Sequence, residues 1–451
     1  MQLFAEITES VATKLGFVAE RARGAKNATF ENLMHLINEE SLKAGYQQLR
    51  KECAVGVDGT SWKEYGERLD ENIKGLVGRI EKMSYRPQAV RRVYIPKDNG
   101  AERPLGIPAI EDKIVQRTMS RVMEAIYEQD FHADSYGFRV GKSCHQALKR
   151  INDLMMTKPI NHVIEADIKG FFDNVEHAKL VGWLRVRIKD ERFVRYVVRF
   201  LKAGYVEEGA FRKTERGTPQ GGNISPMIAN MFLHYVVDEW FAKDAKLRMK
   251  GQGYVVRYCD DFVVLVQYKE DAEMILSELK RRLEDNGLVA NDDKTRSVSF
   301  GRFERENARR FRRKANTFDF LGFTHYICVS RWGNFKVGRK TSKKRMRRSM
   351  VAMNRWLAAI RNALPLKDWW RLLASKMLGH YAYYGVSDNS RSIWLYYRRV
   401  TEMVYKWLNR RSQKSSMSWE GLRKYLERYP LPKPRVRHRF YVPYKLGETT
   451  C

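Results

Sequence analysis

The stretch Tyr254-Val-Val-Arg-Tyr-Cys-Asp-Asp-Phe-Val-Val-Leu-Val266 consists of two apolar, β-branched runs on either side of a short polar centre. Runs of this kind predict a β-hairpin. Asp260 and Asp261 lie at its tip, where adjacent carboxylates repel each other and lose part of their hydration. A cation that neutralises them stabilises such a pair, although an ordinary Asp-Asp surface turn needs none.

A second carboxylate lies upstream, because the apolar run His162 to Ile168 contains Asp167 near its end. The elements that follow alternate in a β-α-β-β-α-β order, which is the ferredoxin-like split. That order brings the first strand beside the hairpin, and with it Asp167 beside Asp260 and Asp261. Three carboxylates at one point suit two Mg²⁺ ions about 4 Å apart, which can hold both oxygens of an in-line phosphoryl displacement. The remaining elements of that order are helical sequence from about His177, a helix from about Asp271 to Asn286 and a strand through Val289 to Phe300.

The composition favours a nucleic-acid partner. Lys and Arg number 84 against 53 Asp and Glu, a formal charge of +31, and basic surfaces attract phosphate backbones. A membrane-surface protein is the alternative, but no long basic amphipathic helix supports it. Five scattered cysteines without a Cys-x-x-Cys pair exclude a disulfide scaffold or zinc knuckle. The absence of a signal peptide and of a long apolar stretch predicts a reducing cytoplasm or nucleoid as the compartment.

The rest of the chain is mainly helical by pattern. Helices are expected over about 30–160, apart from an extended stretch around 91–108. Between Arg331 and Met350 there are nine Lys or Arg and no acid. A helix begins near Ser342, and a second apolar stripe follows Asp388-Asn389-Ser390, which together predict a small helical bundle. The stripes themselves are Met346, Met350, Met353, Leu357 and Ile360, then Ile393, Tyr396, Val400, Met403 and Trp407.

Several short motifs occur in an order that resembles the reverse transcriptases, and more closely the reverse transcriptase and maturase proteins encoded by bacterial group II introns. The resemblance covers roughly residues 30 to 440. Each motif alone is a weak signal, whereas seven in order are specific. They are Gly56-Val57-Asp58-Gly59; Ile95-Pro96-Lys97 with Arg103-Pro104-Leu105-Gly106-Ile107-Pro108; Ser135-Tyr136-Gly137-Phe138-Arg139; Asp167-Ile168-Lys169-Gly170-Phe171-Phe172-Asp173; Gly217-Thr218-Pro219-Gln220-Gly221-Gly222 with Ser225-Pro226; Tyr258-Cys259-Asp260-Asp261; and Phe320-Leu321-Gly322-Phe323.

The resemblance implies an α+β, right-hand polymerase with helical fingers, a ferredoxin-like palm and an all-α basic thumb, called domain X. It places fingers and palm in residues 1–325, with an N-terminal extension of about 60 residues, and the thumb and a short tail in 326–451. The implied activity is RNA-directed DNA polymerisation with two Mg²⁺ ions. Asp167, Asp260 and Asp261 are the implied catalytic residues and, with Ile168, the metal ligands.

Other roles are implied by the same matches. Lys97 and Arg103 would clamp the nucleotide triphosphate, Phe172 would exclude a 2′-hydroxyl, and Gln220 would lie beside the incoming nucleotide. Lys294 could protonate the leaving pyrophosphate. Four residues would contact primer and template, namely Tyr258, Cys259, Leu321 and Gly322. Four thumb residues are the candidates for RNA contacts, namely Lys343, Lys344, Arg347 and Arg348.

The match has departures. Cys259 stands where the family usually has Ala, Val140 where it has Pro, and Asp293 where it has Glu. No segment resembles a His-Asn-His nuclease domain, so self-sufficient target nicking is not expected. Three hypotheses stay open: an intron-encoded enzyme that also assists splicing, a domesticated relative in DNA repair or phage defence, and an RNA-binding splicing factor with a vestigial polymerase. The expected partners are structured RNA template, DNA primer and deoxynucleotides, not a membrane; the oligomeric state stays open.

Overall fold

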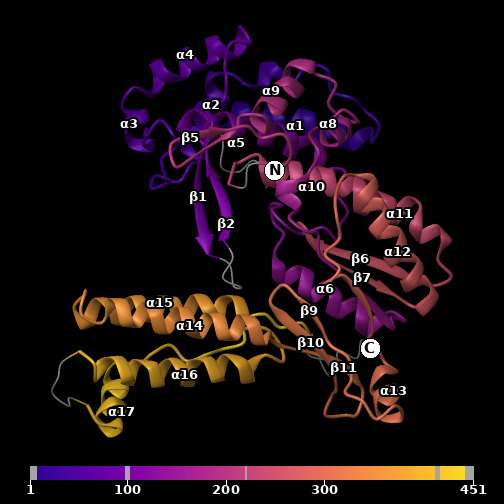
Figure 1. The fold of residues 1–451 in the computed structure, drawn as a ribbon, viewed down its shortest axis with the longest axis vertical. Coiled ribbons are helices and arrows are strands. Elements are labelled where there is room, and N and C mark those ends of the chain that lie inside the picture. The colour runs from indigo at the N-terminus through magenta and orange to yellow at the C-terminus, as the bar shows by residue number, and fades with distance from the viewer. Residues whose placement is uncertain (1–7, 97–101, 219–220, 412–416, 442–451) are drawn as a thin grey trace, which may run out of the picture. The chain divides into compact units, whose positions relative to one another are not determined.

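The computed structural model describes residues 8–96, 102–218, 221–411 and 417–441, and its fold is of the predicted α+β class (Figure 1). The chain divides into two compact units. Unit 1 comprises Met1–Ala147 and Ala166–Ser297, and unit 2 comprises Leu148–Glu165 and Val298–Cys451. The division passes through helix α6 (Cys144–Thr157). The predicted domain boundary at residue 325 stays a prediction.

The N-terminal part of unit 1 is helical, as the sequence predicts. Its central helix is α5 (Ile110–Tyr127), which is buried along most of its length. The side chains of Asn38 and Ser61 cap the helices that follow them in capping boxes, which satisfies backbone N–H groups that a helix start leaves open. The other helices here are α1 (Glu9–Gly24), η2 (Met34–Leu36), α2 (Glu39–Gln47), α3 (Trp62–Glu67) and α4 (Leu69–Glu81).

The extended stretch predicted around 91–108 is a β-hairpin. Strand β1 (Val90–Pro96) pairs antiparallel with β2 (Glu102–Ile107), in a register that sets Ile95 opposite Arg103. Two short strands, β4 (Tyr205–Glu207) and β5 (Ala210–Arg212), complete a sheet of order β2-β1-β4-β5.

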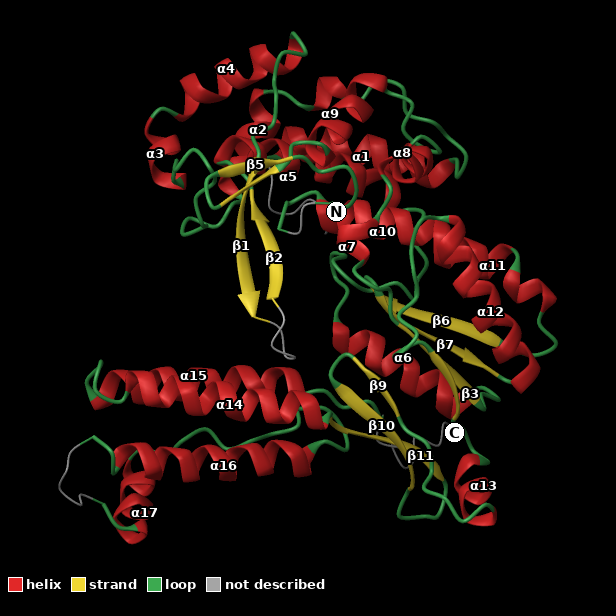
Figure 2. Cartoon of the chain, in the orientation of Figure 1, coloured by secondary structure: helices red, strands yellow, loops and turns green. Residues whose placement is uncertain are grey.

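The predicted ferredoxin-like order is confirmed by the four-stranded sheet β6-β7-β3-β8 (Figure 2). In chain order these strands are β3 (His162–Ala166), β6 (Gly253–Tyr258), β7 (Asp261–Val266) and β8 (Arg296–Ser299). The first strand and the second hairpin strand are the central pair, as the β-α-β-β-α-β pattern requires. Residues 262–266 of β7 are buried, so this strand reads as a continuous apolar run.

Helices connect the strands of this sheet, and α12 (Lys269–Asp285) lies where the sequence predicts a helix. The long connection from β3 to β6 contains α7 (Phe171–Asn174), α8 (His177–Leu184), α9 (Glu191–Leu201) and α10 (Ser225–Leu233). It continues through the π-helix η3 (His234–Glu239), α11 (Trp240–Lys243) and η4 (Ala245–Arg248).

Unit 2 carries a three-stranded sheet and a helical bundle. Strands β9 (Phe318–Phe320), β10 (Phe323–Val329) and β11 (Phe335–Thr341) form a sheet of order β11-β10-β9. The strand-like link expected before Ser342 is therefore a full sheet strand, because β10 gives it a partner over seven positions. Helix α14 begins next to Ser342, as predicted, and the structure shows that the Ser342 side chain caps it. The helices are α13 (Glu304–Arg310), α14 (Lys343–Ile360), α15 (Leu366–Tyr384), α16 (Ser390–Leu408) and α17 (Trp419–Arg428).

Among the described residues, none of the helices combines the length and the apolar character that a membrane crossing requires.

Candidate active site

The hairpin β6–β7 carries Asp260 in a two-residue turn, Cys259 and Asp260, and Asp261 as the first residue after it. Cys259 has a φ of 59°, in the left-handed region that non-glycine residues seldom adopt. Gly137 lies against this turn, because a Cβ at that position would be 2.4 Å from the backbone nitrogen of Cys259. Only glycine permits so close an approach. The glycine of the Ser135–Arg139 motif thus serves the turn that carries Asp260.

A buried ionic network supports the turn from beneath. Arg257 is fully buried, and its Nε donates to Asp238 Oδ1 at 2.8 Å. Its Nη1 donates to the carbonyl of Cys259 and to Asn230 Oδ1, each at 3.1 Å. Asn230 Nδ2 in turn donates to the carbonyl of Gly137 at 2.6 Å. Removing one member of such a buried pair typically costs about 3–5 kcal/mol, because the other charge is left without a partner. The network therefore holds the turn in one position.

Asp167 follows β3 directly and is held by the segment that leads into β8. Its carbonyl accepts from the backbone N–H of Asn291 at 2.8 Å. Its carboxylate Oδ2 accepts from Asn291 Nδ2 at 2.8 Å and from Lys294 Nζ at 2.9 Å. The side chain of Asp167 is 30% exposed, so solvent and ions reach it. The next residue, Ile168, is buried and forms an isolated bridge with Ala290.

The electrostatics connect these residues to one another. Burial raises the pKa of the half-buried Asp260, and the negative charge of Asp167 raises it further, while hydrogen bonds and the charge of Arg103 act in the opposite direction. Asp261 is the exposed first residue of β7. Carboxylates that oppose one another's ionisation fit a hard divalent cation with oxygen ligands. The ammonium group of Lys294 on Asp167 shows that one of them already accepts a cationic partner.

The residues predicted to bind the nucleotide lie in different parts of unit 1. Arg103 is exposed on β2, and its charge acts on Asp260. Phe172 is half-buried on α7, with its ring edge-on to that of the buried Phe171 at 5.1 Å. Lys294 contacts Asp167. Lys97 and Gln220 lie outside the described residues.

A cavity of about 270 Å³ opens beside Phe172. Its lining combines the first hairpin, through Arg92 and Pro104, with the segment that runs from Lys213 to Thr218. Arg92 also stacks on Tyr205, with its guanidinium carbon 3.4 Å from the ring centroid. The Gly217-Thr218 end of the glycine-rich motif therefore shares one cavity with the predicted sugar-selecting ring.

The predicted primer and template residues differ in exposure. Tyr258 is half-buried, whereas Cys259 is 3% exposed and burial raises the pKa of its thiol to about 12. The thiol is therefore protonated at neutral pH. Leu321 and Gly322 form the left-handed turn between β9 and β10 of unit 2, and the carbonyl of Leu321 accepts from the Tyr383 hydroxyl at 2.9 Å. Their predicted contacts with primer stay predictions.

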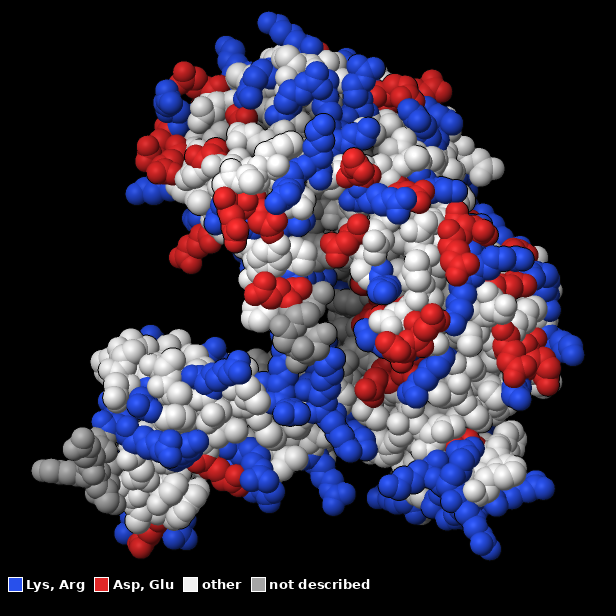
Figure 3. Space-filling view, in the orientation of Figure 1, with Lys and Arg blue, Asp and Glu red and all other residues white. Residues whose placement is uncertain are grey.

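The predicted RNA-binding residues occupy the first turns of α14. All four are exposed, and the first turn contains no acidic residue. Cations at a helix N-terminus oppose the helix dipole, so this charge distribution does not serve the stability of the helix. Figure 3 shows Lys and Arg gathered over this end of α14 and over α13. The four residues are Lys343, Lys344, Arg347 and Arg348.

Sequence reasoning missed the support of the turn. Arg257 lies inside an otherwise apolar strand, and a charged residue in such a run is itself a signal, because an unpaired buried charge is costly. Its partners Asp238 and Asn230 lie in helical sequence and carry no comparable signal. The contact with Gly137 could not be inferred, because it joins segments more than a hundred positions apart.

Comparison with known proteins identifies the family to which the sequence is similar. The sequence profile of the family described as "Reverse transcriptase (RNA-dependent DNA polymerase)" matches residues 95–325, about half of the chain. The matched segment contains the candidate carboxylates, the Arg257 network and most of the first hairpin.

Individual relatives point the same way. Protein YkfC of Escherichia coli K12 is 37% identical over 272 residues, which cover 53% of this chain and 71% of that protein. The group II intron-encoded protein LtrA of Lactococcus lactis subsp. cremoris is 39% identical over 201 residues, covering 44% of this chain and 33% of LtrA. An uncharacterized 91 kDa protein in the cob intron of Schizosaccharomyces pombe is 32% identical over 253 residues, which cover 55% of this chain and 31% of that protein. The chain thus spans most of the first relative but about a third of the other two.

The family profile covers the β-α-β-β-α-β sheet and the hairpin that carries Asp260 and Asp261, and the relative from Escherichia coli matches over most of its own length. The chain therefore belongs to the reverse transcriptase (RNA-dependent DNA polymerase) family.

Proposed function

We propose that this protein is an RNA-directed DNA polymerase of the group II intron type, which extends a DNA primer along an RNA template. The observation that carries the proposal is the pairing of β3, which ends directly before Asp167, with β7, which begins at Asp261, in one sheet. The charge of Asp167 also raises the pKa of Asp260. Two remote segments of the sequence thus bring carboxylates into one electrostatic environment. Nucleotidyl transfer requires this arrangement, because it depends on positioning and charge stabilisation.

In this proposal Asp167, Asp260 and Asp261, with the backbone of Ile168, hold two Mg²⁺ ions. When bound, the ions supply charge neutralisation for the attacking 3′-oxygen and the leaving pyrophosphate. The protein contributes the geometry: Asn291 orients the Asp167 carboxylate, and the Arg257 network fixes the turn. Because these supports are formed within unit 1, the carboxylates need little rearrangement to bind cations.

The nucleotide would bind beside this centre. Arg103 is exposed and within electrostatic range of Asp260, which suits contact with the triphosphate of a bound deoxynucleotide. Phe172 presents a half-buried ring where a 2′-hydroxyl would have to be accommodated. Lys97, Gln220 and Lys294 complete the proposed set, with Lys294 as the proton donor to the leaving pyrophosphate.

The proposal includes a maturase role, in which the protein binds its own intron RNA. It is supported by the exposed basic start of α14 and by the similarity to LtrA, which is intron-encoded. A-form RNA is recognised mainly through phosphates and 2′-hydroxyls, and Lys and Arg on one helix face suit that contact. The domesticated and vestigial alternatives lack a supporting observation of their own.

The direct test is extension of a DNA primer on an RNA template with deoxynucleotides, in buffers with Mg²⁺, with Ca²⁺ or with a chelator. We expect template-dependent products with Mg²⁺ only. Activity that is indifferent to chelation would overturn the assignment of the carboxylates as metal ligands.

Sequencing the RNA that copurifies with the full-length protein tests the maturase role. A single folded intron is the expected result. A heterogeneous mixture, together with intact primer extension, would contradict the maturase role and leave the polymerase in place.

A further inference from the structure

Helix η3 interrupts the helical run between α10 and α11 with π-type hydrogen bonding. Such segments are rare and are frequently found at functional sites. The first and last residues of η3 are His234 and Glu239, and the residue before the last is Asp238, which holds Arg257. The proposed catalytic mechanism makes no use of His234 or Glu239.

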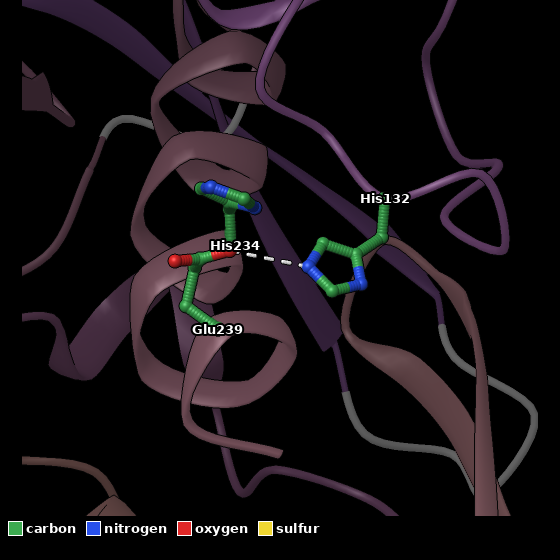
Figure 4. A group of neighbouring side chains, drawn as sticks. All are labelled: His132, His234 and Glu239. Atoms are coloured by element: carbon green, nitrogen blue, oxygen red, sulfur yellow. Dashed lines mark hydrogen bonds and ion pairs between the residues drawn. The ribbon is translucent and has the colours of Figure 1, made fainter. Parts of the chain in front are cut away.

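A third side chain completes a cluster. His132 lies on the loop after α5, and its Nε2 is 3.2 Å from Glu239 Oε1. One ligand atom from each of His132, His234 and Glu239 lies within 4.8 Å of the others. Figure 4 shows His132 reaching from its loop toward the Glu239 carboxylate, with the ring of His234 beside that carboxylate.

The cluster contains a buried donor or acceptor with no partner. His234 is 2% exposed, and its Nδ1 makes no hydrogen bond within the described residues. A buried polar atom of this kind is costly unless something binds it. Asp238 Oδ2 lies 3.9 Å from Nδ1, too far for a hydrogen bond, and that carboxylate is already bound to Arg257.

The protonation states suit a metal. Burial lowers the pKa of His234 to about 4, with the charges of Arg257 and His132 acting in the same direction and those of Asp238 and Glu239 against it. Burial raises the pKa of Glu239, but hydrogen bonds from Lys243 and His132 outweigh it and lower this pKa overall. A neutral imidazole and an ionised carboxylate are the forms that ligate metals.

We propose that His132, His234 and Glu239 form a site for a first-row divalent cation, with Zn²⁺ the best match to two imidazoles and one carboxylate. Ligands of a tetrahedral zinc lie about 3.3 Å apart, given bonds of about 2.0–2.1 Å. The three ligand atoms, which lie within 4.8 Å of one another, would have to approach by at most about 1.5 Å to reach that value. The His132 side chain is 37% exposed, which gives the ion a path, and the Lys243 side chain on Glu239 is 75% exposed and free to move aside.

The site would fasten two supports of the catalytic turn to each other. His132 begins the loop whose Gly137 lies against Cys259, and its carbonyl accepts from Arg139 Nη1 at 2.6 Å. His234 and Glu239 bracket Asp238 on η3. A cation here therefore joins the loop to the helix that holds Arg257, and its role is positional. The binding claim itself does not depend on the proposed polymerase function.

The test is zinc binding by the full-length, metal-stripped protein in the presence of millimolar Mg²⁺. Competition with a chromophoric chelator measures affinity, and Co²⁺ substitution reports tetrahedral coordination through its visible absorption. We expect one tight equivalent and a higher melting temperature with Zn²⁺. His132→Gln and Glu239→Gln should each weaken binding by more than about 100-fold, because even residues outside the ligand shell cost roughly 10–100-fold when mutated.

Two controls make the result specific. His35→Gln removes an exposed histidine that pairs with Asn32 and should leave binding unchanged. Asp260→Asn combined with Asp261→Asn removes the candidate magnesium ligands and should also leave it unchanged. Zinc bound equally by His132→Gln and the parent, or lost in the aspartate double variant, would overturn the proposal. His132 and Glu239 are partly exposed, so these variants test the site even if His234→Gln does not fold.

Discussion

Arginines serve two opposite purposes in this molecule. Arg257 in unit 1 is fully buried and bonded to Asp238, Asn230 and the carbonyl of Cys259. Arg347 and Arg348 in unit 2 lie exposed on α14 without an acidic residue in the first turn. A buried charge with fixed partners specifies geometry, whereas exposed charges act through a field that salt screens. The same residue type therefore positions the carboxylate turn in one unit and offers a binding surface in the other.

Among the substitutions considered, Asp260→Asn is expected to have the largest effect, and it should separate polymerisation from RNA binding. The substitution preserves shape but removes a proposed metal ligand, so deoxynucleotide incorporation should fall by at least about 10³-fold, the upper range for removing one preorganised electrostatic group. RNA binding should stay within about twofold, because it depends on the other unit. Single-turnover primer extension and filter binding measure the two quantities.

Asp285→Asn is the matched control, since Asp285 is exposed at the end of α12. Its incorporation rate should equal that of the parent. Parallel loss of RNA binding and polymerisation in Asp260→Asn would contradict the separation of the two surfaces.

Arg257→Met against Arg347→Met tests burial directly. The first leaves Asp238 without its partner and should lower the free energy of unfolding by about 3–5 kcal/mol. The second removes an exposed charge and should change it by no more than about 0.5 kcal/mol. Urea denaturation of both variants measures the two free energies of unfolding. Equal destabilisation would show that the hydrogen bonds of Arg257 do not stabilise the fold.

Phe172→Val tests whether the ring beside the cavity in unit 1 excludes ribonucleotides. A smaller side chain beside the cavity should admit a 2′-hydroxyl and reduce discrimination against ribonucleotides by roughly 10–200-fold, the range for modest changes in pocket size. The kcat/KM values for one nucleotide in its ribo and deoxy forms measure this. Phe171→Leu, at a buried neighbour, should lower stability and leave the sugar ratio as it is.

Neutralising Lys343, Lys344, Arg347 and Arg348 tests the exposed surface. The slope of log affinity against log salt for RNA binding should decrease by about 0.7–0.9 for each RNA phosphate that the variant no longer neutralises. The control removes an equal charge elsewhere in unit 2, through Arg309, Arg310, Arg312 and Lys314 around α13. If the control changes the slope as much as the α14 variant does, RNA binding depends on the total charge of the protein and not on the basic residues of α14.

The smallest effect concerns pH. The raised pKa of Asp260 means that the folded, metal-free protein binds this proton more tightly than the unfolded chain does. Its ionisation therefore disfavours folding, a penalty that appears as pH rises from the unfolded pKa through the folded one. Without divalent cations, Asp260→Asn should melt slightly above the parent at neutral pH, and the difference should shrink as pH falls. Scanning calorimetry at several pH values measures it.

Local pattern was enough to predict much of this protein. The apolar runs predict the hairpin, the strand before Asp167, helix α12 and the start of α14 near Ser342, because periodicity and helix-start signals depend on neighbouring residues. The order of these elements also predicts the strand order of the carboxylate-bearing sheet, since the β-α-β-β-α-β topology leaves few ways to bury it.

Contacts between distant segments are of another kind. The sequence by itself determined which residue types stand at the strand ends, and thus the three candidate carboxylates and the basic face of α14. Only the tertiary structure decided that Gly137 and Arg257 grip the turn, that Lys294 pairs with Asp167, and that His132 meets Glu239. The reason is physical: such pairs are selected by where whole elements pack, and no local propensity or spacing records that choice.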